Sequence, residues 1–146
     1  MIKEHIDFKT IREEFSEYEI ENGQILKLKH ILVDIVNEPI EGKLRGKLGT
    51  KDISYVYTPE GIDTTGMEIS TPEQVTEKDQ VRELSFKPTK EVINIYETEK
   101  SLILIITGIS KIFLTNKKDK ENAPIIRYTG QHGIEVIEKL TFSEPK

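Results

Sequence analysis

The chain has 146 residues, which fits a single domain over residues 1–146 that can bury a core without covalent cross-links. It contains no cysteine, and this excludes disulfides, thiolate metal sites and a cysteine nucleophile. The formal net charge of -5 argues against general binding to duplex nucleic acid. The charged N-terminus and the lack of a long apolar run favour a cytoplasmic protein without a membrane span.

Two β-strands joined by a tight turn are expected first. Asn22-Gly23 separates alternating segments at residues 14–21 and 24–36, and this dipeptide is a strong hairpin signal. A third strand is expected at Ile53–Thr58, where β-branched and aromatic residues dominate. These strands make up a first structural unit at about residues 6–58.

The alternation of apolar residues changes phase inside the segment at 24–36. Leu26 and Leu28 define one face, whereas the apolar positions beyond His30 are odd-numbered and include Val33 and Ile35. Because side chains alternate across a strand, continued burial needs an extra residue or a sharp bend. The sequence therefore predicts a bulge or corner near His30.

A polar, acidic and turn-rich connection follows at residues 59–80. Thr71 is a candidate N-cap, Pro72 suits the first helical position and Gln74 suits the third. We therefore expect one short helix from Pro72 to about Lys78. Whether the connection acts as a lid or as a linker is left open.

A second unit, at about residues 84–142, resembles the first. Shifting the sequence by 78 positions brings Phe8 onto Phe86, Tyr18 onto Tyr96 and further identical pairs into line, and it places His30 over Gly108. Glycine inside a strand often marks a bulge, so a second corner is expected there. A chance likeness between two strand-rich segments of biased composition remains the alternative.

Further strands of the second unit are expected at 101–114, at Ile125–Thr129 and from Ile134 onward. Three or four strands cannot enclose a core alone, so the two units must pack together about a pseudo-twofold axis. The predicted fold is all-β, a small barrel or orthogonal β-sandwich built from two duplicated repeats of three to four strands, with one short helix between them. The apolar run Leu102–Ile106 should be buried on both faces, one of them by another chain, and this predicts self-association.

No local motif predicts catalysis, a cofactor or a metal. His5, His30 and His132 show no metal-ligand spacing, and a half-buried structural role is the expectation for His30. No serine lies in a nucleophile elbow, and the acidic clusters alternate with apolar residues as on a solvated sheet face. An enzyme is therefore the less favoured interpretation.

Two basic loops, at 43–51 and 117–120, are candidate anion-binding sites. The glycine-rich stretch at 42–49 differs from a phosphate-binding loop in spacing and lacks its Ser or Thr. Loops at equivalent positions in two repeats can converge at one end of a barrel, although two solvated hairpin tips would look the same. The candidate residues are Lys43, Arg45, Lys47, Lys51, Lys117, Lys118 and Lys120.

The expected function is that of a non-enzymatic binding or assembly module that acts through protein–protein contacts, including contacts with its own copies. One alternative is an anion or nucleic-acid binder that uses the basic loops, although these carry no aromatic stacking platform. The other is a small-ligand protein or enzyme with a site inside the barrel.

Overall fold

The computed structural model describes residues 4–40 and 43–140, with the side chains of residues 38–45 left out of the description. The predicted all-β class is confirmed, and all strand pairs but one are antiparallel. The elements are β1 (Glu4–His5), β2 (Lys9–Arg12), β3 (Ser16–Ile20), β4 (Ile25–Ile40), β5 (Lys43–Tyr57), β6 (Glu68–Ile69), η1 (Glu77–Asp79), β7 (Gln80–Leu84), β8 (Phe86–Lys90), β9 (Ile93–Glu97), β10 (Ser101–Lys118) and β11 (Pro124–Glu138).

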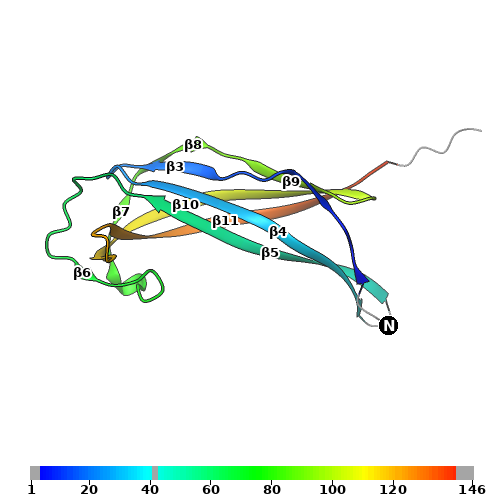
Figure 1. The fold of residues 1–146 in the computed structure, drawn as a ribbon, viewed down its shortest axis with the longest axis horizontal. Helices are drawn as coiled ribbons and strands as arrows, with labels where there is room; N and C mark the ends of the chain where they lie inside the picture. The colour runs from blue at the N-terminus through cyan, green and yellow to red at the C-terminus, as the bar shows by residue number, and fades with distance from the viewer. Residues whose placement is uncertain (1–3, 41–42, 141–146) are drawn as a thin grey trace, which may run out of the picture.

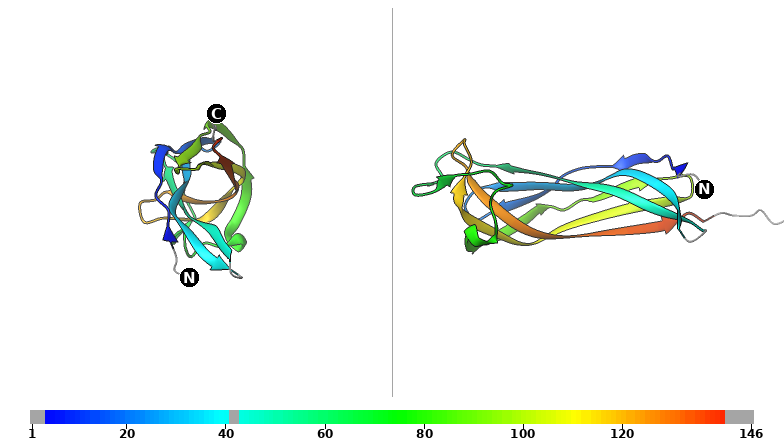
Figure 2. Two further views of the ribbon diagram at one scale, coloured as in Figure 1. Left: turned by 90° about the vertical axis from the view of Figure 1, so that its right-hand side faces the viewer. Right: turned by 90° about the horizontal axis from the view of Figure 1, so that it is seen from below.

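The strands form two sheets in an elongated molecule. Sheet A contains β1, β3, β4, β5 and β8, and sheet B contains β2, β6, β7, β9, β10 and β11. Two long hairpins, β4–β5 and β10–β11, run along the length of the molecule (Figure 1). Viewed along the long axis, the two sheets face each other (Figure 2).

The short strands β2 and β8 each pair with a strand from the other half of the chain. β2 lies beside β9, with Lys9 opposite Glu97. β8 lies beside β3, with Lys87 opposite Glu19. Lys9 and Lys87 are 78 positions apart in the sequence, and so are Glu19 and Glu97, so both crossings have the same register.

Two core clusters lie between the sheets, each with an aromatic pair. Tyr18 packs edge-on against Phe86 at 6.0 Å between ring centroids, and Tyr96 packs edge-on against Phe8 at 5.7 Å. Tyr18 and Tyr96 are 1% and 0% exposed. Because each phenylalanine comes from, or directly precedes, a crossing strand, β2 and β8 tie the two halves together.

The first hairpin is confirmed. Ile20 donates a backbone hydrogen bond to Gln24 across the turn, and Gly23 adopts a φ of 96°. Only glycine takes this left-handed conformation without strain, which explains the Asn22-Gly23 sequence.

Both predicted corners lie a few residues from their expected positions. The β4–β5 ladder shifts register between Leu32 and Asp34, and the β10–β11 ladder shifts between Ile109 and Lys111. The extra residue is therefore Val33 rather than His30, and Ser110 rather than Gly108. The even-numbered residues of β4 stay buried as far as Leu32. Val33 is 53% exposed, so the prediction that its side chain is buried was wrong.

In the second hairpin, one face of the apolar run Leu102–Ile106 is buried within the chain. Ile103 and Ile105 are 2% and 0% exposed and face the core, whereas Ile106 points outward and is 42% exposed. The strands expected at Ile125–Thr129 and from Ile134 are parts of one strand, β11, because its pairing with β10 continues across both segments.

The connection at 59–80 contains no helix at Pro72–Lys78. A single turn forms there, in which Gln74 and Val75 both donate to the Thr71 carbonyl. The helical segment is instead the 3-10 turn η1, which Thr76 and Asp79 close through two hydrogen bonds. The chain must extend again at Gln80 to enter β7, and this leaves no room for a longer helix. Within the described residues, no helix is long and apolar enough to cross a membrane.

Candidate functional site

The outer face of sheet B carries an apolar surface across its central strands. Directly opposed residues of an antiparallel pair point to the same side of the sheet. One row across β2, β9, β10 and β11 therefore reads Arg12, Ile95, Leu104 and Glu135. Its two ends carry opposite charges and its middle is apolar.

The adjacent rows extend this surface, which we call the sheet B patch. Ile93, Ile106 and Ile137 are 41%, 42% and 44% exposed, and the remaining members are half-buried. Lys9 and Lys139 both form ion pairs with Glu97 beside the patch, at 3.3 and 3.0 Å. The patch consists of Ile93, Ile95, Leu102, Leu104, Ile106 and Ile137.

The outer face of sheet A is charged at the matching positions. The corresponding row across β8, β3, β4 and β5 reads Lys90, Glu17, Lys27 and Tyr55. Lys27 pairs with Glu17 at 3.1 Å between Nζ and Oε1. The central residues of this row are therefore apolar in sheet B and charged in sheet A. Because both rows pair in the same way, strand pairing alone does not require apolar residues there.

A groove of about 780 Å³ opens between the sheets at the end of the molecule where β10 begins. Its apolar lining includes Ile35 and Leu48 from the β4–β5 hairpin, Ile103 and Val136 from the β10–β11 hairpin, and Ile6. Val136 faces the same side as Ile103 but is 49% exposed. Carboxylates dominate the polar rim, which contains Glu4, Asp7, Glu99 and Glu138 beside Lys100.

The predicted basic loops do not converge. The described β4–β5 ladder ends with the pair Ile40–Lys43 at the end of the molecule where β10 begins, and the β10–β11 ladder ends with the pair Lys118–Pro124 at the other end (Figure 1). Lys47 and Lys51 are exposed, and Lys51 pairs with Ile31 well inside β5. The side chains of Lys43 and Arg45 lie outside the described residues. The long strands keep the two groups apart.

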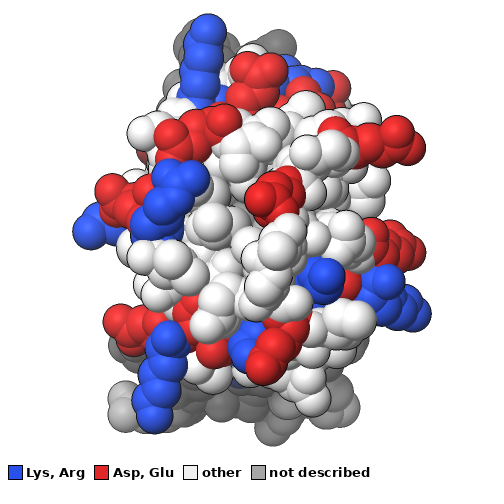
Figure 3. Space-filling view, turned by 90° about the vertical axis from the view of Figure 1, so that its left-hand side faces the viewer, with Lys and Arg blue, Asp and Glu red and all other residues white. Residues whose placement is uncertain are grey.

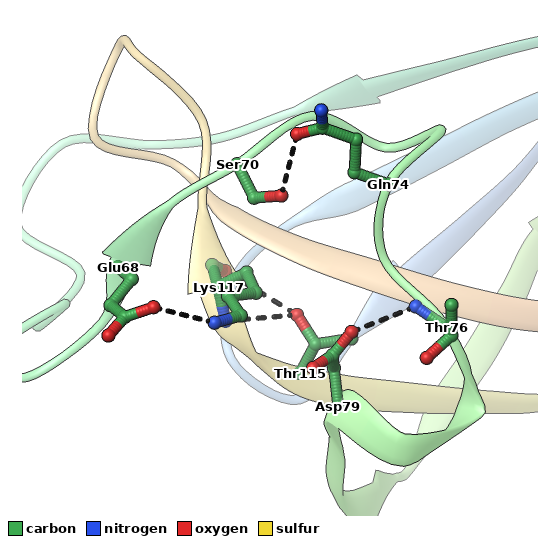
Figure 4. A network of polar contacts seen from close by, with 7 residues as sticks. All are labelled: Glu68, Ser70, Gln74, Thr76, Asp79, Thr115 and Lys117. Atoms are coloured by element: carbon green, nitrogen blue, oxygen red, sulfur yellow. Dashed lines mark hydrogen bonds and ion pairs between the residues drawn. The ribbon is translucent and has the colours of Figure 1, made fainter.

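Lys117 is held inside a polar network (Figure 4). Its Nζ lies 2.8 Å from Oε2 of Glu68, and its backbone N–H donates to Thr115. The hydrogen bond with Glu68 raises the pKa of Lys117 and lowers that of Glu68. Lys118 is half-buried and Lys120 is exposed. Basic and acidic side chains are interspersed at this end of the molecule, without a concentrated basic field (Figure 3).

The structure brings together two of the three histidines. The imidazoles of His30 on β4 and His132 on β11 stack, with 4.1 Å between ring centroids. Asp52, opposite His30 on β5, contacts its Nδ1. Sequence spacing did not reveal this cluster, because its members come from three strands and lie 22 to 102 positions apart.

No family model, curated protein or solved structure matches this chain. Functional conclusions therefore rest on the geometry of the molecule.

Proposed function

We propose that the protein is a non-enzymatic assembly module whose copies associate through the sheet B patch. The observation that carries this proposal is the contrast between the two outer sheet faces: sheet B has the half-buried Ile95 and Leu104 where sheet A has Glu17 and Lys27. Contiguous exposed apolar surface on a folded protein typically marks an interaction site.

A second copy is the occupant that best fits the charges around the patch. Arg12 borders it on the β2 side and Glu135 on the β11 side. A twofold axis parallel to the strands places the β2 side of one copy over the β11 side of the other, so Arg12 faces the second copy's Glu135 twice. Two sheets packed face to face in this way bury their apolar middles against each other.

The module is proposed to be a duplicated, barrel-like sandwich with exchanged strands. The matching registers of Lys9–Glu97 and Lys87–Glu19 support this, as do the two edge-on aromatic pairs. The short strands β1 and β7 also pair with β4 and β10 at corresponding places, next to the ends of the long strands. Equal registers favour duplication over a chance likeness of two strand-rich segments.

Single-cysteine labelling tests the position of the interface, because the chain contains no cysteine of its own. In an Ile106→Cys variant, the rate of maleimide labelling should fall as protein concentration rises, since association covers this position. A Tyr55→Cys variant is the control, because Tyr55 is 56% exposed on the outer face of sheet A. Concentration-independent labelling of Ile106→Cys, or equal protection of both variants, would contradict the proposed interface.

A small-ligand protein is the second candidate, and the groove favours it. Its apolar lining and 780 Å³ volume are of the kind that holds a small molecule. Anion binding through the basic loops has less support, because the two loops lie at opposite ends and Lys117 is already paired with Glu68.

A further inference from the structure

We propose that His30, Asp52 and His132 form a binding site for a divalent transition-metal ion of the zinc class. The ligand atoms of the three side chains all lie within 4.8 Å of one another. Two imidazoles and one carboxylate are ligands that Zn²⁺ accepts, with metal–ligand distances of about 2.0 to 2.2 Å. Three protein ligands leave one tetrahedral position for water.

His30 is the fixed ligand of this site. Its side chain is 5% exposed. Its Nδ1 contacts Asp52, and its Nε2 is buried with no hydrogen-bond partner among the residues that the structure describes. A buried polar atom without a hydrogen-bond partner lowers the stability of the fold. A bound metal ion would give this imidazole a function that offsets the loss.

Asp52 and His132 are the adjustable ligands. The Asp52 side chain is 59% exposed, and His132 is exposed as well. Ligand atoms around a tetrahedral zinc ion lie about 3.3 Å apart, as follows from the metal–ligand distance. Asp52 must therefore move away from His30 slightly, and His132 must turn out of its stacked position. Both are side-chain rotations that exposed residues make freely.

The metal would link two strands that are not otherwise paired with each other. Within the described ladders, β5 pairs with β4 and β11 pairs with β10, and each strand leaves its other edge without a partner. His30 and Asp52 belong to sheet A, and His132 belongs to sheet B. An ion bound to all three would join the sheets where these two edges approach each other, and binding should therefore stabilise the fold.

Calorimetric titration of the tag-free protein with zinc chloride tests the site. We expect one ion per chain, and a thermal midpoint that rises with the zinc concentration. His132→Ala and Asp52→Asn should each weaken binding at least about tenfold and remove the thermal shift, because each removes one of three ligands. Both residues are exposed, so both variants should fold.

The matched control is His5→Ala, which removes the other exposed histidine, on β1. It should bind zinc as the unchanged protein does. The proposal is overturned if the protein shows no saturable zinc binding, if His132→Ala and Asp52→Asn bind as tightly as the unchanged protein, or if His5→Ala loses as much affinity as they do.

Discussion

Gly130 is the glycine whose side-chain space is most restricted by backbone on the β10–β11 ladder. A Cβ atom at Gly130 would lie 2.9 Å from the carbonyl oxygen of Gly108, whereas a Cβ at Gly108 would lie 4.0 Å from the nearest atom, the Gln131 carbonyl oxygen. Neither glycine has a positive φ, so the difference between them comes from the space around each one.

We therefore expect Gly130→Ala to lower the free energy of unfolding by about 1 to 3 kcal/mol, because backbone has to move to admit the methyl group. Gly108→Ala should change it by less than about 0.5 kcal/mol. Urea unfolding of the two variants gives both values. Equal losses would show that close backbone approach does not limit this position.

Tyr96 makes stability depend on alkaline pH. Burial is the main cause that raises its pKa from 10.0 to about 12, and the hydroxyl also donates to Glu13 at 3.0 Å. The folded state therefore holds the phenolic proton more tightly than the unfolded state does. This contribution to stability is complete below pH 10 and is lost as the pH rises to about 12.

Tyr96→Phe has no proton to lose, so its stability should fall less over that range than that of the unchanged protein. Denaturant midpoints measured at several pH values between 9 and 12 test this expectation. Identical pH profiles for the two proteins would mean that Tyr96 ionises equally in the folded and unfolded states.

At the scale of elements, β11 presents a different apolar residue to each side of sheet B. Val136 faces the groove and Ile137 belongs to the sheet B patch, and the two are similarly exposed at 49% and 44%. If the groove takes an apolar ligand, Val136→Asp should abolish the fluorescence enhancement of the neutral probe Nile red, and Ile137→Asp should leave most of it.

Loss of the fluorescence enhancement in Ile137→Asp but not in Val136→Asp would place the probe on the sheet B patch. If both variants keep the full enhancement, the probe binds to neither surface. Because the two residues are neighbours on one strand, an effect on strand pairing would appear in both variants alike. The comparison therefore separates the two surfaces.

The elements that the sequence predicts well are those set by local chemistry. Asn22-Gly23 encodes its turn, and alternation encodes the strands around it. Corner positions were missed by two or three residues, because burial of His30 and Leu32 depends on what the opposite sheet supplies. A run of five apolar residues carries no periodicity to distinguish its faces, so the sequence alone did not show which face of β10 points inward.

The candidate sites were less predictable than the fold. The sheet B patch follows in part from the continuous apolar run Leu102–Ile106, but its row from Arg12 to Glu135 depends on a strand exchange that no local pattern encodes. The histidine cluster depends on the same packing of distant strands. The sequence predicted basic loops at 43–51 and 117–120, but residues 43–51 lie in strand β5, and Lys117 and Lys118 are the last residues of β10. The length of the strands sets the distance between the two basic groups.

At the scale of the whole molecule, the two halves share registers and aromatic pairs but differ in their outer surfaces. The outer face of sheet A carries ion pairs such as Lys27–Glu17, whereas that of sheet B carries the isoleucines and leucines of the sheet B patch. In the duplication that we propose, one half can change its surface while the other preserves the fold. We propose that the second half acquired an interaction surface, the sheet B patch.

Sedimentation equilibrium over a wide range of protein concentration tests this claim most directly. The proposed dimer predicts a mass that rises from the 16.8 kDa of one chain to twice that value. It predicts that Leu104→Lys combined with Ile106→Lys keeps the mass at one chain, whereas the control Tyr55→Lys associates like the unchanged protein. A mass of one chain at every concentration, or association that persists in the Leu104→Lys, Ile106→Lys variant, would contradict the proposed assembly.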